Sequence, residues 1–264
     1  MGNEYVDAGY ADDGTYFFTS RQFIFTYGAA RLELRGPASR SGSIRLLQPE
    51  ETTAGWVRYG YTPRAIIHTL KLDYRRMSAT EAADLATFRA AVDYTAKQFS
   101  YINGATGEII PCWFEQPEQE IEQAGFNLYR GQVAFLAITP FIAYPGSPPA
   151  NLDAILATAQ YPYKQTISRA QQRLWMSNGT PRIYNQSGIK RTTHGITLVR
   201  KSAADLGALL SYFVNTAVGI KNRWPWTDGG TPRSVRFAEP VIEWRQSPLN
   251  TALYDVDLVL EEDQ

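Results

Sequence analysis

Residues 202–213 are Ser-Ala-Ala-Asp-Leu-Gly-Ala-Leu-Leu-Ser-Tyr-Phe, and residues 78–85 are Ser-Ala-Thr-Glu-Ala-Ala-Asp-Leu. In both stretches a serine is followed three positions later by an acidic residue, the pattern of a capping box at the start of a helix. Apolar residues then recur at three- and four-residue steps, which predicts one buried stripe on each helix. The stripes consist of Ala82, Leu85, Phe88, Val92 and Thr95 in the first helix, and Leu206, Leu209, Leu210, Phe213 and Ala217 in the second, with Gly219 as a stop.

Strand patterns lie on both sides of each predicted helix. Apolar and polar residues alternate over Thr69–Tyr74 and Gly195–Val199, which predicts half-buried strands before the helices. Turn signals follow the helices at Asn103-Gly104 and Gly229-Gly230. Four further strands are then predicted, at Ile109–Phe114, Val235–Phe237, Gln132–Ile138 and Leu253–Leu260.

The two halves of the chain match in order as well as in type. The capping serines are separated by 124 positions (202 − 78), and Phe114-Glu115-Gln116-Pro117 precedes Phe237-Ala238-Glu239-Pro240 by 123 (237 − 114). His68 and His194 begin the two matching segments and are interpreted as equivalent. An ordered series at a nearly constant offset predicts a duplicated domain. The alternative is two unrelated α+β segments that share generic helix and strand patterns.

The predicted fold class is α+β, mainly β, with two tandem domains that each carry one packed helix. The predicted parts are an N-terminal arm at 1–20, a first domain at 21–144 with an insertion near 37–55, a linker at 145–161 and a second domain at 162–264. The linker begins with Pro145-Gly146-Ser147-Pro148-Pro149, which cannot continue a strand or helix, and Asn151–Thr158 fits one or two helical turns. Ahead of the matching parts, Gln22–Thr26 and Arg31–Leu34 are strand candidates, and Arg31-Leu32 is aligned with Arg173-Leu174.

Composition excludes several classes of function. The 264 residues contain 26 basic and 26 acidic side chains, and this zero balance argues against a dedicated nucleic-acid binder and favours self-association. The single cysteine excludes an intrachain disulfide and a multi-cysteine zinc site. The longest apolar stretch, 133–143, is too short to cross a membrane, and no signal peptide is present, so we expect a soluble protein made in a cytoplasm.

Few residues are candidates for chemistry. No nucleophile or carboxylate accompanies His68 and His194 at matching positions, so both are interpreted as polar residues at strand starts. Cys112 lies in an apolar strand and is interpreted as a buried structural thiol. The acidic set Glu115, Glu118, Glu120 and Glu122 fits a solvated hairpin edge better than a glycosidase pair.

Three short motifs have a functional interpretation beside a structural one. Trp224-Pro225-Trp226 fits a core cap or an interface, and a surface that stacks on a sugar is the alternative. Asp12-Asp13-Gly14 is a fragment of a calcium loop without its other ligands, and Asn178-Gly179-Thr180 is interpreted as a turn. The sequence therefore predicts no catalytic, cofactor-binding or metal-binding residue, and no enzyme.

The segments that begin at Ser78 and Ser202, together with the closing Phe114–Pro117 and Phe237–Pro240 segments, resemble the distal tail and minor tail proteins of long-tailed bacteriophages. The resemblance covers roughly residues 65–140 and 190–262. It implies a tail-tube-like β-sandwich with one helix in each copy. The tandem arrangement and the long segment before Trp56 depart from that pattern.

This resemblance implies a structural virion protein that forms a ring at the tail tip or baseplate. The expected partners are further copies of the chain, as a trimer with a pseudo-sixfold ring or as a hexamer, and the tail tube, hub and fibre proteins. DNA would pass through the ring without specific binding, and no membrane is involved. The alternatives are a glycan-hydrolysing enzyme and a carbohydrate-binding module that uses Trp224 and Trp226.

Overall fold

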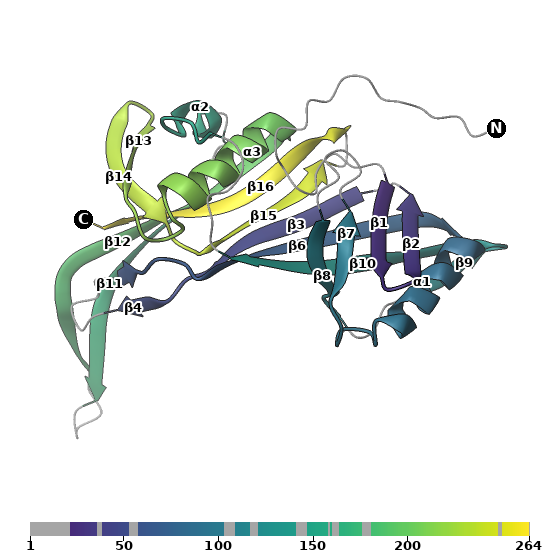
Figure 1. Ribbon diagram of the computed structural model, residues 1–264. Helices are drawn as coiled ribbons and strands as arrows, with labels where there is room; N and C mark the ends of the chain where they lie inside the picture. Colours follow the sequence, from purple (N-terminus) through teal and green to yellow (C-terminus); the bar gives the residue numbers. More distant parts are fainter. Residues whose placement is uncertain are drawn as a thin grey trace. The chain divides into compact units, whose positions relative to one another are not determined.

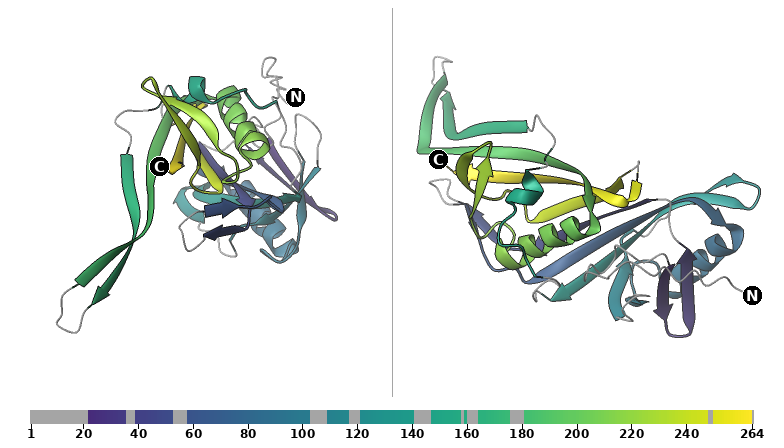
Figure 2. Two further views of the ribbon diagram at one scale, coloured as in Figure 1. Left: turned by 90° about the vertical axis from the view of Figure 1, so that its left-hand side faces the viewer. Right: turned by 90° about the horizontal axis from the view of Figure 1, so that it is seen from above.

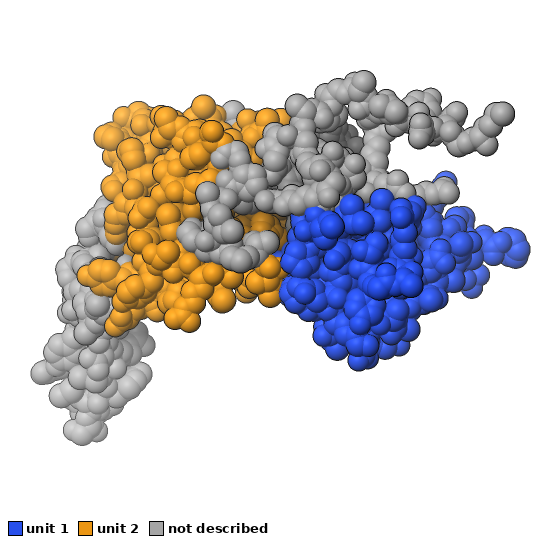
Figure 3. Space-filling model, in the orientation of Figure 1, with its two compact units in different colours: residues 1–40, 69–137 blue, residues 41–68, 138–264 orange. Residues whose placement is uncertain are grey.

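The computed structural model describes residues 22–35, 39–52, 58–102, 109–116, 121–140, 147–157, 159, 164–175, 181–247 and 250–263. Strands dominate these residues, and almost all of the strands pair antiparallel in one hydrogen-bonded series (Figure 1). The predicted class, α+β and mainly β, is confirmed. The chain divides into two compact units (Figure 3).

Unit 1 comprises residues 1–40 and 69–137. Its strands follow the hydrogen-bonded order β6-β10-β8-β7-β1-β2, and β9 pairs with β10. The helix α1 packs against β2. The elements are β1 (Gln22–Tyr27), β2 (Ala30–Arg35), β6 (Ala65–Ser78), α1 (Ala79–Ala91), β7 (Phe99–Ile102), β8 (Ile109–Phe114), β9 (Ile121–Gly125) and β10 (Leu128–Pro140).

Unit 2 comprises residues 41–68 and 138–264. Its strands follow the order β11-β12-β16-β15-β3, and α3 packs against β12 and β16 (Figure 2). The elements are β3 (Ser39–Leu47), β4 (Glu50–Thr52), β5 (Arg58–Gly60), α2 (Asp153–Leu156), β11 (Lys164–Trp175), β12 (Pro181–Ser202), α3 (Ala203–Ser211), the π-helix η1 (Tyr212–Thr216), β13 (Trp224–Asp228), β14 (Thr231–Phe237), β15 (Val241–Ser247) and β16 (Asn250–Asp263). Strands β3, β6 and β10 contribute residues to both units.

The same pairing scheme occurs twice in the chain. After α1, β7 pairs with β8, β8 with β10 and β9 with β10; after α3, β13 pairs with β14, β14 with β16 and β15 with β16. The strand that enters each helix, β6 or β12, pairs with the strand that closes the series, β10 or β16. We call β3 and β6–β10 with α1 the first repeat, and β11–β16 with α3 the second.

The register of the strands is also repeated. Phe114 pairs with Phe135 in the first repeat, and Phe237 pairs with Leu260 in the second. The pair Gln123–Tyr129 has its counterpart in Gln246–Tyr254, where the same two residue types face each other. The offset is 123 positions for β8 and β9 and 125 for β7 and β10, so only the lengths of the turns differ.

Both predicted capping boxes are confirmed. The Ser78 hydroxyl accepts a hydrogen bond from the Glu81 backbone amide at 3.2 Å, and the Glu81 carboxylate accepts from the Ser78 amide at 2.9 Å. Ser202 and Asp205 make the same two bonds, at 3.1 and 3.3 Å. Each serine thus ends a strand and starts a helix in one step, because its side chain satisfies an otherwise unpaired amide of the first turn.

The helices end alike despite a difference in length. Two consecutive residues adopt left-handed backbone conformations after each helix, Asp93 and Tyr94 in the first repeat and Val218 and Gly219 in the second. The offset between the repeats rises from 124 at the capping serines to 125 at these residues. The extra residue is taken up by the π-helix η1, since a π-turn accommodates one residue more than an α-turn. Gly219, the predicted stop, has φ +63°.

A cluster of three rings lies beneath each helix in nearly the same geometry. Phe88 meets Phe99 edge-on at 5.4 Å and 82°, and Phe99 meets Phe114 at 4.9 Å and 47°. In the second repeat the equivalent rings meet at 5.6 Å and 80°, and at 5.8 Å and 46°; they are Tyr212, Trp224 and Phe237. Aromatic pairs prefer such edge-on and tilted arrangements, so the two cores are held by the same contacts.

The two histidines are not equivalent, and the sequence interpretation is wrong on this point. Buried residues along β6 and β12 keep equal distances from the capping serines, so His194 corresponds to Leu70, whereas His68 corresponds to Thr192. Side chains two residues apart on a strand face the same way, so a shift of two residues preserves the apolar pattern. The alternation of residue types could not reveal the shift.

The segment interpreted as an insertion contributes a strand to unit 2. Residues 41–45 of β3 pair antiparallel with residues 241–245 of β15, and residues 41–68 group with unit 2. At the offset of 124 positions that relates β6 to β12, Arg182 and Ile183 correspond to Arg58 and Tyr59 of β5, which pair with Thr52 and Glu51 of β4. The counterpart of the 173–174 segment is therefore β4, and not the Arg31-Leu32 segment of β2, which pairs with β1.

Candidate functional site

Both histidines are buried, which removes them from solvent chemistry. Burial lowers the pKa of His68 to about 4, so this side chain is neutral at neutral pH. His194 has no exposed surface; its Nε2 atom lies 3.4 Å from Glu262 Oε2, and its ring meets Trp226 edge-on at 5.4 Å. Each histidine is enclosed within a core, not presented in a cleft.

A cluster of charged side chains is buried at the end of β16 in unit 2. Glu261, 2% exposed, accepts from the guanidinium of Arg236 on β14 and lies 3.4 Å from Arg191 on β12. The next residue, Glu262, accepts from Arg233 at 2.9 Å. Neighbouring strand residues point to opposite faces, so each face of the sheet carries one carboxylate with its own arginine. Carboxylates engaged in this way bind the strands together.

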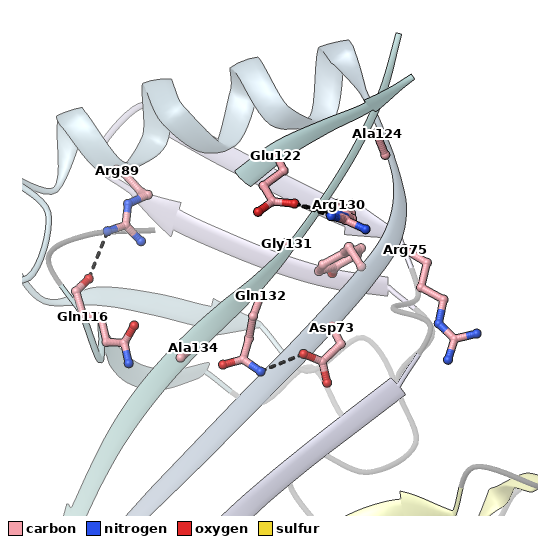
Figure 4. Close-up of a pocket in the computed structure, with 11 residues that line it drawn as sticks. Asp73, Arg75, Arg89, Gln116, Glu122, Ala124, Arg130, Gly131, Gln132 and Ala134 are labelled. Atoms are coloured by element: carbon pink, nitrogen blue, oxygen red, sulfur yellow. Dashed lines mark hydrogen bonds and ion pairs between the residues drawn. The ribbon is translucent and has the colours of Figure 1, made fainter. Parts of the chain in front are cut away.

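A polar pocket of about 760 Å³ lies in unit 1, between α1, β6, β9 and β10 (Figure 4). Across it, Glu122 accepts two hydrogen bonds from Arg130, at 2.6 and 2.8 Å, and Asp73 accepts one from Gln132 at 2.7 Å. On its far side Arg89 is 6% exposed and donates to the Gln116 carbonyl at 2.9 Å. The carboxylates of the pocket are thus held by cross-strand partners.

Arg89 is the most unusual side chain of this pocket. Its guanidinium lies 4.6 Å from the centre of the Phe114 ring, and burial lowers its pKa from the ordinary arginine value. The described lining residues include no histidine, cysteine, serine or lysine. The pocket can therefore hold a polar or anionic group, and its described lining offers no nucleophile with an adjacent base.

The remaining described candidates are structural. Cys112 is fully buried, and burial raises the pKa of its thiol to about 12, as expected for a structural cysteine. Trp224 and Trp226 are only 4% and 3% exposed, so neither offers the open face that a sugar needs for stacking. Glu122 is exposed on the edge strand β9, in agreement with the solvated hairpin edge, and Glu115 lies 4.0 Å from Lys71.

Several candidates lie outside the described residues: Glu118 and Glu120, Asp12–Gly14, Asn178–Thr180, and the arm at 1–20. Within the described ranges, no group of three or more histidine, cysteine, aspartate or glutamate side chains could hold a metal ion. None of the helices described by the structure has the length and hydrophobicity that crossing a lipid bilayer requires.

Exposed strand edges are a surface that the residue pattern did not locate on particular strands. Strand β9 pairs only with β10, and β11 only with β12, among the residues that the structure describes. Residues 122–124 of β9 and 164–168 of β11 are exposed. Edge strands present unpaired amide and carbonyl groups, which makes them templates for another strand. Alternating polarity gave no signal for these edges, because it reports the faces of a strand and not its neighbours.

Comparison of the chain with models of known protein families and with curated proteins finds no match.

Proposed function

We propose that this protein is a structural virion component of a long-tailed bacteriophage, whose copies form a ring at the tail tip or baseplate. The ring would connect the tail tube to the hub or fibres and leave a central channel for DNA. The protein would be made in the cytoplasm of the host bacterium and function in the assembled tail.

The repeat is the observation that carries this proposal. Each chain carries two copies of one strand-pairing scheme, with the same register and the same cluster of three aromatic side chains beneath the helix. One chain can therefore fill two nearly equivalent positions in a ring-shaped assembly. A ring of three chains then offers six such positions, and a ring of six offers twelve. The zero net charge supports the passage of DNA without tight binding, since phosphate affinity requires an excess of basic residues.

A carbohydrate-binding or glycan-hydrolysing tail module is the second candidate. The polar pocket of unit 1 favours it, because arginine, glutamine and carboxylate side chains line a space of about 760 Å³ (Figure 4). The buried Trp224 and Trp226 count against it, because aromatic faces are the usual platform for sugar rings. Substitution of Arg130 by Ala should abolish any glycan binding at this pocket and leave ring assembly intact.

The proposal is tested by the native mass of the purified chain, measured by light scattering over a concentration series, followed by negative-stain imaging. We expect a trimer or hexamer with a central hole. A chain that remains a monomer at all concentrations and binds or cleaves a bacterial surface glycan would overturn the ring in favour of the second candidate.

A further inference from the structure

The turn between β9 and β10 carries the most exposed large apolar side chain that the structure describes. Gly125 pairs with Leu128, so Phe126 and Asn127 form the whole turn. Asn127 has φ +55°, a left-handed conformation that asparagine adopts more readily than most residues. Phe126 has no such role in the turn, and its side chain is 91% exposed. The fold therefore accounts for Asn127 and gives no reason for the phenylalanine beside it.

This turn forms the end of a projection from unit 1. Figure 3 shows the projection in blue at the right-hand side, and Figure 1 identifies it as the hairpin of β9 and β10. No charged residue lies between Gln123 and Tyr129, and Leu128 is 42% exposed. We call Phe126 and Leu128 the apolar tip. Aromatic residues are enriched in protein–protein interfaces, where they fill pockets on the partner.

A pocket of about 380 Å³ lies on the hairpin of β13 and β14 in unit 2. Pro225 pairs with Ser234, and Pro232 lies two residues before Ser234, so these three side chains share one face of the hairpin. All three are exposed, whereas Trp224 and Trp226 are buried. We call this space the proline pocket; its described lining is Arg223, Trp224, Pro225, Pro232, Arg233 and Ser234.

The two prolines determine what kind of partner this pocket accepts. Proline has no backbone N–H, so Pro225 and Pro232 make β13 and β14 poor templates for a further strand. Their rings offer apolar surface instead, which suits an inserted side chain. A cavity of about 150 Å³ is large enough to bind benzene. The proline pocket, at about 380 Å³, therefore admits a phenyl ring together with part of its turn.

Charge complementarity favours an uncharged aromatic side chain as the occupant. The described lining of the proline pocket contains two arginines and no acidic residue. Arg233 is engaged by Asp228 and Glu262, and Arg223 is exposed. An arginine guanidinium is attracted to the negative face of an aromatic ring, whereas a basic side chain would be repelled here. The apolar tip supplies such a ring and brings no charge of its own.

The polar pocket of unit 1 is a poorer acceptor for the tip. Strand β9, which carries the tip, itself supplies Glu122 and Ala124 to the wall of that pocket. Most of the other described lining residues are charged or carry an amide. A phenyl ring placed there would take charged groups out of water without giving them a partner, which is unfavourable.

We propose that the apolar tip of one copy inserts Phe126 into the proline pocket of a second copy of this chain. This inference rests on the proposed ring and names one contact within it. The contact is heterologous, because each chain gives its tip to one neighbour and receives a tip from another. Contacts of this kind form a closed ring when the rotation between neighbours closes. Phe126 is one anchor of a larger interface, since a stable interface buries about 800 Å² on each partner and a phenylalanine about 150–250 Å².

Substitution of Phe126 by Ser tests the anchor, because serine is common in turns and lacks the ring. Ile109→Ser is the matched control, since Ile109 is 65% exposed in unit 1 but lies on β8. We expect Phe126→Ser to raise the concentration at which half of the chains are assembled by at least about tenfold, and Ile109→Ser to leave it unchanged. Equal thermal unfolding of the two variants verifies the fold. Assembly of Phe126→Ser at the wild-type concentration overturns the proposed contact.

Substitution of Ser234 by Trp tests the pocket by filling it. Thr231→Trp is the control, because Thr231 is exposed on the same strand and does not line the pocket. We expect Ser234→Trp to impair assembly and Thr231→Trp to assemble normally. A mixture of Phe126→Ser and Ser234→Trp chains should form a dimer and nothing larger, because one intact tip and one intact pocket remain in each pair. A mixture that stays monomeric well above the wild-type assembly concentration overturns the contact.

Photochemical cross-linking locates the acceptor without removing the ring. The photoreactive analogue p-benzoylphenylalanine replaces Phe126, and isotopically labelled chains are mixed with unlabelled chains before irradiation. We expect mass spectrometry to find the cross-link within residues 223–234 of another copy. Cross-links that fall elsewhere, or within one chain, overturn the assignment of the proline pocket.

The results separate this contact from the ring itself. A wild-type chain that stays a monomer overturns both proposals. A wild-type ring that forms equally well from Phe126→Ser and from Ser234→Trp chains overturns the contact and leaves the ring in place. Binding of the wild-type chain to phosphatidylcholine vesicles, lost in Phe126→Ser, overturns the contact in favour of a lipid surface as the partner of the tip.

Discussion

The two repeats share their backbone register but differ in the chemistry at equivalent positions. In unit 1 the guanidinium of Arg89 lies 4.6 Å from the Phe114 ring; in unit 2 the equivalent pair is Phe213 edge-on to Phe237 at 4.9 Å. A charged side chain and an aromatic one thus fill the same place above the same ring. The space beside Arg89 belongs to the polar pocket of unit 1. The comparison shows that the fold tolerates exchange of polar and apolar partners where the contact geometry is kept.

Cross-strand charge pairs show the same principle with exchanged signs. Glu122 on β9 pairs with Arg130 on β10, and at the equivalent positions Arg245 on β15 faces Asp255 on β16. The hydrogen bond between Asp73 and Gln132 has a counterpart between Thr197 and Asp257. Each pair keeps its complementarity although the residue types have changed sides. Pairing across strands, not residue identity, is therefore the property that the repeats have in common.

The largest expected effect concerns the buried ion pair that distinguishes the repeats. Arg236 pairs with Glu261 in unit 2, where the equivalent pair of unit 1 is Trp113 and Leu136. Arg236→Leu leaves the Glu261 carboxylate buried without its closest partner, and we expect a loss of about 3–5 kcal/mol in the free energy of unfolding. Urea unfolding followed by circular dichroism measures it.

The double variant Arg236→Leu with Glu261→Leu is the control for that prediction. It places an apolar pair where unit 1 has one, and no carboxylate remains to be desolvated, so stability should return to within about 1 kcal/mol of the wild type. A double variant as unstable as the single one would show that the charges themselves hold unit 2 together.

The next effect concerns the ends of the two helices. The first repeat has Tyr94 in the left-handed position that Gly219 occupies in the second. A Cβ atom on Gly219 would overlap the Gln48 amide and lie 2.9 Å from Leu46 Cδ1. We expect Gly219→Ala to destabilise the protein by about 3 kcal/mol, from backbone strain and displacement of Gln48, which bonds the backbone of Val218 and Ile220.

Gly229→Ala is the matched control for the helix end. Gly229 also has a positive φ, +53°, but open space surrounds its Cβ position. Its substitution should cost about 1 kcal/mol, from backbone strain alone. Equal effects of the two alanines in thermal unfolding would mean that the contact with Gln48 contributes nothing.

A pH dependence should distinguish His68 from its counterpart Thr192. The folded-state pKa of about 4 lies below the unfolded value of 6.5, so the unfolded chain binds more protons between these values. Stability should therefore fall as the pH decreases from 6.5 towards 4, by up to about 3 kcal/mol, and this contribution should be constant above pH 7. Unfolding free energies at several pH values measure the slope. His68→Thr should remove this part of the slope, and an unchanged profile would contradict the assignment.

The smallest effect concerns the exchanged charge pair. Reversal of the unit 1 pair by Glu122→Arg with Arg130→Glu copies the polarity of unit 2. Both side chains are about 60% exposed, so solvent screens them, and we expect a change in monomer stability below about 0.5 kcal/mol. Thermal unfolding of the reversed variant beside the wild type measures the change.

Local sequence was sufficient for the helices, their caps and part of eight of the sixteen described strands. The capping boxes at Ser78 and Ser202 depend on residues three positions apart, and the stop at Gly219 depends on the conformational freedom of one residue. The strand at 109–114 was predicted with its observed bounds. An apolar stripe or a period of two is a local property, so these predictions needed no knowledge of the fold. Thr95, predicted on the first stripe, lies beyond the end of α1, because the chain turns left-handed at Asp93.

By itself, therefore, the sequence determined the class of the fold, the repeat and the burial of Cys112. It also determined the half-buried strands that contain His68 and His194. Only the tertiary structure decided which edges meet: that β3 covers β15, that His194 corresponds to Leu70, and that Arg89 lines a pocket. The physical reason is that alternation along a strand specifies its two faces and leaves its two edges unspecified. Edges are satisfied by backbone groups, which are the same for every residue type, so their partners are chosen by the packing of the whole chain.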